Sequence, residues 1–381
     1  MIKKVLIAGA GIRGKRLGTF FKKIEDIEVA YIDNNEMLWG TEINEITCYP
    51  MDAFVGEDKD VIVLISPENA EGLYKQCSSL YSNIIYNKRI IDVLANNAFV
   101  VGYEDFLQIG HFYSTYPIVD EVLSKPDYAN IDMEHAIPGI DFNQEKQYET
   151  LQKMMTYYDK VFTWNRIEDE KDSPYRFKRG NESISDADAL GLFCMLNVIK
   201  PKRLIEVGSG HSSAITLDVN EYFFDNKISL HFIEPYADRF KSILKESDNV
   251  DLQEVGLQDI ELPYFDQLGA GDILFIDSTH VSKAGSDVNY LFFEILPRLK
   301  SGVIIHLHDI FYPFEYPHEW IKRGTVWNEL YLLRAFLQYN ADFEIIYFQN
   351  MMEKFHREEI EAKWPIENSG IHGGSFWMRK K

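Results

Sequence analysis

The stretch Leu204-Ile-Glu206-Val-Gly208-Ser-Gly210-His-Ser-Ser213 sets the fold of the C-terminal half of the chain. The apolar run over residues 203–207 predicts a buried strand, and residues 213–220 predict a helix. The glycines between strand and helix allow a tight turn and a close approach of the backbone to a ligand. The start of a helix directly after such a turn attracts the polar groups of that ligand. The stretch therefore predicts a ligand site at the end of a strand in an α/β sheet.

Carboxylates around this turn favour S-adenosylmethionine (SAM) as the ligand. Glu206 is placed where it can pair with the ammonium group of the methionine part. Glu234 ends the next predicted strand and can accept both ribose hydroxyls, while Gln258 and Asp259 follow a third strand and can border the adenine. The turn residues expected around the same ligand are Gly208, Ser209, Gly210, Ser212 and Ser213. Another nucleotide, NAD included, is the alternative ligand.

Short apolar runs alternate with amphipathic segments in two separate parts of the chain. Predicted strands in the first part cover residues 5–8, 28–32, 61–65 and 84–86. Predicted strands in the second part cover residues 203–207, 230–233, 273–276 and 303–307. Such alternation is typical of parallel sheets covered by helices. We predict two Rossmann-like, doubly wound α/β domains, at residues 1–102 and 186–381, with a connecting helical segment at residues 103–185 between them.

The composition limits the range of partners. The 381 residues carry 39 Lys and Arg against 60 Asp and Glu, a net charge of −21 that disfavours nucleic acid and anionic membranes. Cys48, Cys77 and Cys194 lack the spacing of a disulfide framework or a zinc site, as expected in a reducing compartment. No segment approaches the roughly 18 consecutive apolar residues of a membrane helix. We expect a cytoplasmic protein that acts on a small molecule, without membrane insertion, and that can form homo-oligomers.

A second Gly-rich turn lies near the N-terminus, in Gly9-Ala-Gly11-Ile-Arg-Gly14. It has GxGxxG spacing between a predicted strand and a helix, and Asp33 ends the next strand, where a carboxylate can bind ribose hydroxyls. Binding of a nucleotide or NAD by Gly9, Gly11, Gly14 and Asp33 is one interpretation. The other is a degenerate Rossmann domain whose glycines only pack the strand against the helix.

Two resemblances follow from these motifs. Residues from Lys4 to about Leu94 resemble the N-terminal domains of nucleotide-sugar-modifying enzymes, such as bacterial sugar acyltransferases and UDP-sugar dehydratases. Residues from about Ile137 to Gln349 resemble bacterial class I SAM-dependent methyltransferases associated with surface-glycan biosynthesis. The segments that carry the second resemblance are 137–141, 200–213, 232–236, 272–280, 285–289, 306–311 and 327–331. This resemblance implies a class I methyltransferase fold for the C-terminal domain and SAM as its cofactor.

Two turns with several ionisable side chains follow the predicted strands at residues 273–276 and 303–307 of that domain. They are Asp277-Ser-Thr-His280 and His308-Asp309, and both are expected at the edge of the sheet where ligands bind. Methylation of a hydroxyl needs a base for its proton. His280 is the first candidate, because histidine is often neutral near pH 7, and Asp277 and His308 are the alternatives. Asp277 also adjoins the expected SAM site.

A divalent metal is a further hypothesis for these two turns. Related macrolide sugar O-methyltransferases keep carboxylates after the same two strands to hold magnesium. The resemblance therefore implies a metal site at Asp277, His308 and Asp309, although an imidazole is a softer ligand than magnesium prefers. The alternative is that the two aspartates only cap turns.

Other residues leave two interpretations open. Trp320, Trp327 and Tyr331 can form an aromatic lid for a sugar ring, or they can be packing residues. Arg176 and Arg179 can bind an anionic acceptor, although a solvated loop is the simpler interpretation.

The sequence thus predicts a SAM-dependent methyltransferase. Its expected acceptor is a hydroxyl of a sugar, nucleotide-sugar or glycan precursor. The alternative is an NAD(P)-dependent nucleotide-sugar oxidoreductase that uses the Gly-rich turn at residues 9–14. The absence of a Tyr-x-x-x-Lys motif counts against that alternative.

Overall fold

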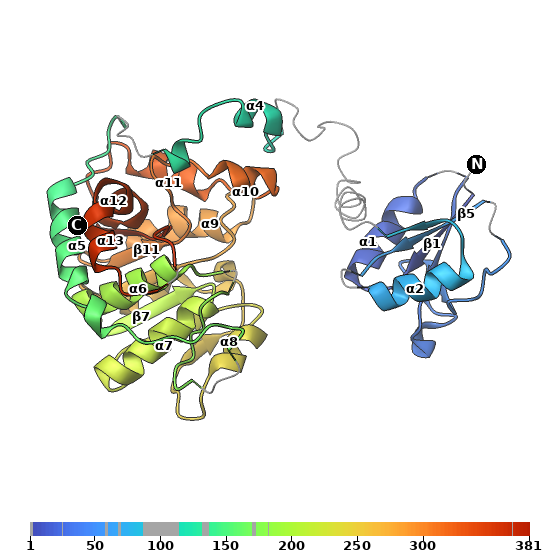
Figure 1. Ribbon diagram of the computed structural model, residues 1–381, viewed down its shortest axis with the longest axis horizontal. Helices are drawn as coiled ribbons and strands as arrows, with labels where there is room; N and C mark the ends of the chain where they lie inside the picture. Colours follow the sequence, from blue (N-terminus) through green and yellow to red (C-terminus); the bar gives the residue numbers. More distant parts are fainter. Residues whose placement is uncertain are drawn as a thin grey trace. The chain divides into compact units, whose positions relative to one another are not determined.

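The computed structural model describes residues 3–24, 26–57, 60–67, 70–86, 114–131, 137–169, 173–181, 183–367 and 369–381. The chain divides into two compact units, Met1–Pro117 and Ile118–Lys381. Each unit contains a sheet of mainly parallel strands with helices packed on it (Figure 1). The predicted domain boundary after residue 102 and Leu94, the end of the N-terminal resemblance, lie outside the described residues.

The C-terminal unit is built on a seven-stranded sheet with the order β9-β8-β7-β10-β11-β13-β12. Its strands are β7 (Arg203–Val207), β8 (Ser229–Ile233), β9 (Asp251–Gln253), β10 (Ile273–Ile276), β11 (Ile304–Leu307), β12 (Phe343–Phe348) and β13 (Phe376–Lys380). The strands from β9 to β11 are parallel, and β13 runs antiparallel to both of its neighbours. The strand order reverses direction between β7 and β10, and ligands of doubly wound sheets bind at such a point.

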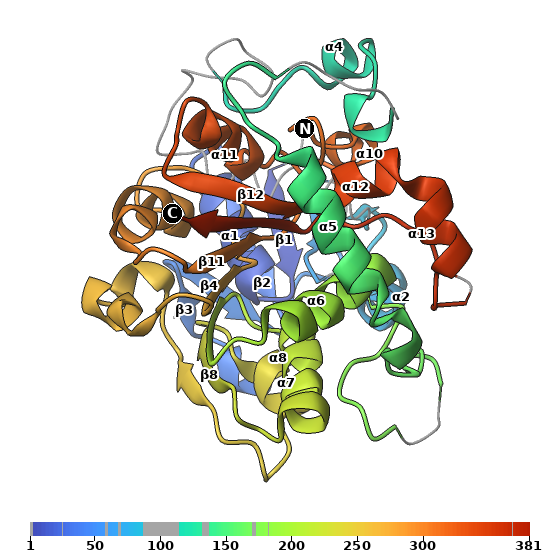
Figure 2. The ribbon, with the colours of Figure 1, turned by 90° about the vertical axis from the view of Figure 1, so that its left-hand side faces the viewer.

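Helices of the C-terminal unit pack against this sheet and against one another. They are α4 (Val119–Leu123), α5 (Gln144–Met155), α6 (Asp186–Ile199), α7 (His211–Phe224), α8 (Asp238–Ile243), α9 (Asp287–Tyr290), α10 (His318–Lys322), α11 (Glu329–Leu337), α12 (Gln349–Phe355) and α13 (Arg357–Lys363). Residues 187–197 of α6 are all buried, as expected for a helix that is apolar around its whole circumference. Figure 2 shows α5 beside α6 and over β12, with which it is in contact.

The core of the C-terminal unit explains why its strands are so apolar. Leu204, Ile205 and Val207 of β7 are buried, and so is the whole of β10. Parallel strands inside a sheet are covered on both faces, so their sequences are continuous apolar runs rather than alternating ones. The polar residues of the loops that follow are therefore left at the carboxyl edge of the sheet.

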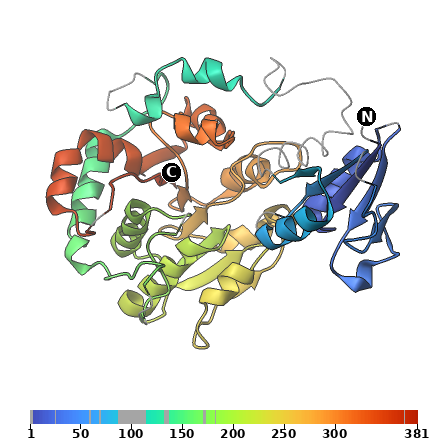
Figure 3. The ribbon, with the colours of Figure 1, turned by 45° about the vertical axis from the view of Figure 1, so that its right-hand side comes forward.

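The N-terminal unit has a six-stranded sheet with the order β3-β4-β2-β1-β5-β6 (Figure 3). Its strands are β1 (Lys4–Ala8), β2 (Glu28–Ile32), β3 (Glu42–Ile43), β4 (Ile46–Tyr49), β5 (Val61–Ile65) and β6 (Ile84–Ile85). Its described helices are α1 (Ile12–Phe21) and α2 (Glu71–Leu80). All pairings are parallel except that of β3 with β4. With the C-terminal sheet, this confirms the predicted pair of Rossmann-like α/β folds.

The structure differs from the sequence prediction in two segments. The sequence pattern over residues 288–299 predicts a single helix, but α9 ends at Tyr290 and continues as a wider turn over Leu291–Ile295 and a 3-10 turn over Leu296–Arg298. Pro297 lacks an amide hydrogen and cannot continue a helix. The expected connecting segment at 103–185 is also not uniform, because α5 packs into the C-terminal unit. None of the described helices is long and apolar enough to cross a membrane.

Candidate active site

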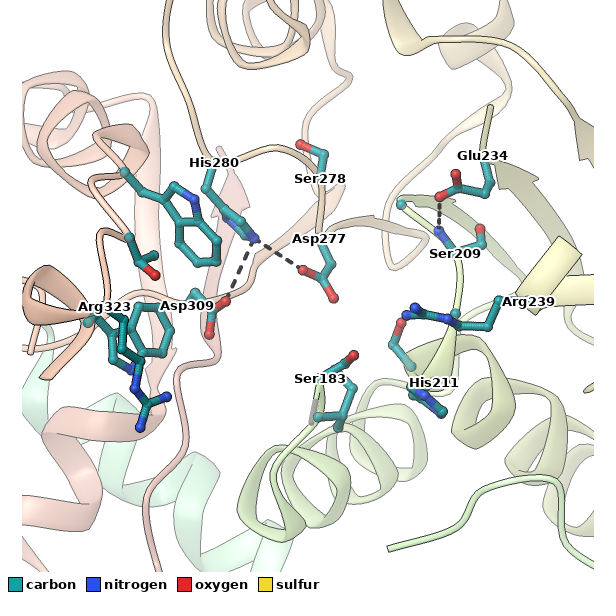
Figure 4. Close-up of a pocket in the computed structure, with 17 residues that line it drawn as sticks. Ser183, Ser209, His211, Glu234, Arg239, Asp277, Ser278, His280, Asp309 and Arg323 are labelled. Carbon is teal, nitrogen blue, oxygen red and sulfur yellow. Dashed lines mark hydrogen bonds and ion pairs between the residues drawn. The ribbon is translucent and has the colours of Figure 1, made fainter. Parts of the chain in front are cut away.

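A cavity of about 490 Å³, here named the first cavity, opens at the carboxyl ends of the parallel strands of the C-terminal unit. Much of its lining comes from the turns after β7, β8, β10 and β11. The lining residues from these turns are Gly208, Ser209, Gly210, His211, Ser212, Glu234, Asp277, Ser278, His280 and Asp309. Figure 4 shows their side chains around a common space. The fold therefore brings together most of the residues predicted for SAM binding and for catalysis.

Gly208 lets the loop after β7 pack against the turn after β10. Its φ angle is +82°, a conformation that residues with a side chain rarely adopt. A Cβ atom at this position would lie 1.7 Å from the carbonyl oxygen of Asp277. The glycine is thus required because two functional turns touch through its backbone. Gly210, by contrast, has an extended φ and space for a methyl group.

Glu234 is held at the rim of the first cavity by two backbone amides. Its Oε2 atom accepts a hydrogen bond from the amide of Ser209 at 3.1 Å, and its Oε1 atom accepts one from Tyr236 at 2.8 Å. An ionised carboxylate has about four acceptor positions, so two remain for a ligand. The bond to Ser209 also links the end of β8 to the Gly-rich loop (Figure 4).

Glu206 lies elsewhere than the prediction placed it. The side chain is fully buried, is absent from the lining of the first cavity, and accepts hydrogen bonds of 2.7 Å from Ser212 and from Ser213. Burial raises its pKa to about 8 despite these two bonds. Glu206 therefore holds the start of α7 through its two serine partners. Because it does not line the first cavity, it is not placed to contact the SAM ammonium as expected.

Gln258 and Asp259 also lie outside the lining of the first cavity. They are exposed on a 3-10 turn, Leu257–Asp259, and the Gln258 amide donates to the carbonyl of Gly285 at 2.9 Å. The expected contact with adenine was based on their place after the third strand. The chain forms this tight turn directly after Gly256, and neither residue contributes to the described lining.

Asp277, His280 and Asp309 form a cluster on one side of the first cavity. Nε2 of His280 lies 3.3 Å from Oδ1 of Asp277 and 3.7 Å from Oδ2 of Asp309 (Figure 4). One ligand atom from each of the three residues falls within 4.8 Å of the others. His280 and Asp309 both have a φ of +59°, an uncommon backbone conformation for residues other than glycine. Such strain is typical of functional sites, where the surrounding structure maintains it.

The other nitrogen of His280 contacts Glu329, a residue that was not singled out in the sequence. Nδ1 lies 2.8 Å from Oε2 of Glu329, which is fully buried. Ionised carboxylates only accept hydrogen bonds, so partners on both sides require both ring nitrogens to carry hydrogen. Burial disfavours that charge, but Asp277 and Glu329 outweigh it and hold the pKa of His280 well above its usual value. With carboxylates facing both ring nitrogens, this arrangement favours the charged ring over the neutral base that the sequence predicts.

Comparison with known proteins places this site in a family. Residues 205–310 match the family model of a methyltransferase domain. An uncharacterized protein of Archaeoglobus fulgidus is 32% identical over 161 residues, which span 42% of this chain and 72% of that protein. The chain therefore contains a methyltransferase domain and belongs to the same family as the Archaeoglobus fulgidus protein.

Three solved structures show weaker likenesses to the methyltransferase. The plantazolicin methyltransferase BpumL is 11% identical with a TM-score of 0.32, over 50% of this chain and 81% of that one. The methyltransferase FkbM of Methylobacillus flagellatus is 14% identical with a TM-score of 0.31, over 90% and 85% of the two chains. UDP-D-quinovosamine 4-dehydrogenase of Vibrio fischeri is 22% identical with a TM-score of 0.21, over 26% and 87%.

His308 of the methyltransferase does not join the ligand cluster in which it was predicted. Its Nε2 atom lies 3.6 Å from Oδ1 of Asp309, but its ring borders a different cavity, described below. Burial lowers its pKa, yet Asp309 and Asp277 raise it to about 9. The prediction of a metal set with His308 is thus corrected, because the structure places His280 with Asp277 and Asp309 instead.

Two arginines in the first cavity were not predicted as site residues. Arg239 lies next to the Gly-rich loop, and Arg323 lies on the other side of the cavity, after α10 (Figure 4). Neither guanidinium forms an ion pair or hydrogen bond with any described residue. Trp320 and Trp327, predicted as lid residues, also line the cavity, whereas Tyr331 donates to Glu315 outside the described lining.

Arg176 is not a solvated loop residue. Its side chain is 2% exposed and forms ion pairs with Asp218 at 2.9 Å, with Glu221 at 2.7 Å and with Asp248. Asp218 also accepts hydrogen bonds from the backbone amides of Arg176 and Phe177. This cluster binds the loop before α6 to α7, so its role is structural.

The Gly-rich turn of the N-terminal unit is held by its own residues. Gly9 has a φ of +93°, and a Cβ atom on Gly14 would lie 1.9 Å from the carbonyl oxygen of Gly9. Asp33 accepts a hydrogen bond of 2.9 Å from the amide of Ala10. A Cβ atom on Gly11, by contrast, would meet nothing within 4 Å. Gly9, Gly14 and Asp33 thus shape the turn, and Gly11 faces open space.

Proposed function

We propose that the first cavity binds SAM and transfers its methyl group to a hydroxyl of a sugar, nucleotide-sugar or glycan precursor. A single observation supports this most strongly. One cavity joins the Gly-rich loop and Glu234, which suit SAM, to the cluster of Asp277, His280 and Asp309, which suits a hydroxyl acceptor. The residues that suit the methyl donor and those that suit the methyl acceptor therefore line the same cavity. Positioning of this kind accounts for much of the rate of such transfers.

The lining suggests how SAM lies in the first cavity. The ribose hydroxyls bind the two free acceptor positions of Glu234. The methionine part then lies along the loop from Gly208 to Ser212, next to the start of α7, which favours its carboxylate. Arg239 binds the carboxylate of SAM, because its side chain packs next to Gly210 and lacks a partner among the described residues.

The cluster on the other side of the cavity then handles the acceptor hydroxyl. His280 is bonded at both nitrogens, so its role is to orient the carboxylates of Asp277 and Asp309. These carboxylates hold the hydroxyl by hydrogen bonds and accept its proton as the oxygen attacks the methyl group. Glu329 fixes the ring of His280 from behind and is a positioning residue.

The same cluster fits a divalent cation. One imidazole nitrogen and two carboxylate oxygens lie close enough together to share an ion, which would take the place of the proton on Nε2 of His280. Glu329 completes the carboxylate–histidine pairing common behind metal ligands. Asp277, His280 and Asp309 would hold the ion. When bound, it would favour the ionised form of an acceptor hydroxyl. An imidazole nitrogen beside two carboxylates suits manganese better than magnesium, which prefers oxygen ligands.

The N-terminal unit is proposed to bind a nucleotide or nucleotide-sugar through the turn at residues 9–14. The turn is preshaped by Gly9, Gly14 and Asp33, and Gly11 leaves space for a phosphate near the start of α1. In this proposal residues 1–102 form the nucleotide-binding domain, and residues 186–381 form the methyltransferase domain.

Transfer of a labelled methyl group from SAM tests the proposed reaction. The purified protein is incubated with SAM labelled in its methyl group and with sugars, nucleotide-sugars and proteins as acceptors. We expect the label to appear in a sugar or nucleotide-sugar. Removal of divalent ions with a chelator should abolish the transfer, and addition of manganese or magnesium should restore it. Label that appears only in protein or only on nitrogen would contradict the proposed acceptor class.

A further inference from the structure

A second cavity of about 390 Å³ lies next to the first and shares part of its wall. The shared lining residues are Ser183, Ile184, Asp309 and Trp320. Asp309, which belongs to the cluster described above, therefore faces both cavities. A molecule in the second cavity would therefore contact the wall that Asp309 shares with the first cavity.

The chemistry of the second cavity suits a neutral group with several hydroxyls. Its described lining includes carboxylates of Asp188 and Glu319 and the amide of Asn350, but neither lysine nor arginine. His308 also lines this cavity, and its Nε2 atom lies 3.6 Å from Oδ1 of Asp309. Hydroxyls can donate to carboxylates and bond to amides, whereas an anion would be repelled. Trp320 adds a flat apolar face of the kind that supports a sugar ring.

The first cavity contains one more arginine than is needed to bind the carboxylate of SAM. SAM has a single carboxylate, and Arg239, beside the Gly-rich loop, is placed to bind it. Arg323 lies on the opposite side with Trp320, and it has no ion pair with a described residue. Arg323 is exposed at this cavity, and a guanidinium there is suited to bind a carboxylate or phosphate of a ligand.

We propose that the acceptor carries an oxyanion group, a phosphate or a carboxylate, which Arg323 binds while a hydroxylated ring of the same molecule enters the second cavity. Trp320, which lines both cavities, lies between the two parts. This inference rests on the proposed function, because it assigns the rest of the first cavity to SAM. It narrows the acceptor to acidic or phosphorylated sugars, nucleotide-sugars included.

Calorimetric titration of the protein saturated with S-adenosylhomocysteine tests this inference. The probes are UDP-glucose, glucuronate and glucose, which present a phosphate, a carboxylate and no charge. We expect at least one charged probe to bind more tightly than glucose. Arg323→Gln should weaken that probe at least about tenfold, the usual effect of losing a charge-assisted hydrogen bond. Arg298→Gln is the matched control, since Arg298 is exposed beside Glu294 outside both cavities.

The outcomes separate this inference from the proposed function. Tighter binding of UDP-glucose assigns the oxyanion to phosphate, and tighter binding of glucuronate assigns it to carboxylate. Trp320→Leu should weaken UDP-glucose more than UDP, because only the sugar reaches the second cavity. The inference would be overturned, and the proposed function would not, by either of two results. One is an equal loss of probe affinity in the Arg323 and Arg298 variants, and the other is the absence of binding of any charged probe while S-adenosylhomocysteine binds. Failure to bind SAM or S-adenosylhomocysteine would overturn the proposed function with it.

Discussion

Replacing His280 by alanine is expected to lower kcat by a factor of about 10²–10⁴ while the Kd for SAM stays nearly unchanged. The imidazole touches Asp277, Asp309 and Glu329 on the acceptor side of the first cavity. Its loss leaves the carboxylates without their common partner, so the acceptor hydroxyl is no longer held in line with the methyl group. Initial rates at saturating SAM, together with calorimetric titration of SAM, measure the two effects separately.

Glu329 provides the finer version of this test. Glu329→Gln keeps the shape of the side chain but removes the charge that holds Nδ1 of His280 at 2.8 Å. We expect kcat to fall by about 10–100-fold, as for other residues that orient a functional histidine, with KM for SAM unchanged. His356→Ala is the control, because His356 stacks on Tyr148 outside the first cavity. If both site variants reduced SAM affinity instead of turnover, the assigned roles would be wrong.

Replacing Arg176 by leucine is expected to lower the free energy of unfolding by about 3–5 kcal/mol. The guanidinium is nearly inaccessible and is surrounded by Asp218, Glu221 and Asp248. Leucine fills some of the space but leaves Asp218, which is fully buried, without its cation. Removal of one partner from a buried ion pair costs far more than the pair itself contributes. Urea denaturation followed by circular dichroism gives the difference in the free energy of unfolding.

Arg166 supplies a matched control for this substitution. It forms an exposed ion pair with Glu168, and exposed pairs contribute little because water and salt screen them. Arg166→Leu should therefore leave the unfolding transition almost unchanged. A stability loss in the Arg176 variant no larger than that of the Arg166 variant would show that the buried cluster does not hold the loop before α6.

The sequence predicts the strands of both sheets well where they are internal and parallel. β7, β10 and β11 are buried on both faces, so their apolar runs and the polar residues after them are visible without a structure. The edge strand β12 and its antiparallel neighbour β13 were not predicted. They lie beyond the parallel part of the sheet, and the antiparallel insertion of β13 beside β11 depends on contacts between distant segments.

The candidate site was predictable only where a motif and a strand end coincide. Glu234, Asp277, His280 and Asp309 follow strands, and the shared edge of the sheet brings them to one cavity. Glu329 and Arg323 come from helices after the last parallel strand, and nothing in their local sequence indicates which strand end they approach. Glu206 illustrates the opposite case, since a motif carboxylate can support a loop without touching the ligand.

Calorimetric titration of SAM into the protein and its Glu234→Gln variant tests the central claim most directly. We expect one SAM per chain and a loss of affinity of at least about tenfold in the variant, because the amide replaces the charged acceptor of the ribose hydroxyls. Asp238→Asn, an exposed change on α8 outside the first cavity, should bind SAM like the wild type. The claim would be contradicted by the absence of SAM binding in the wild type, or by equal affinities in all three proteins.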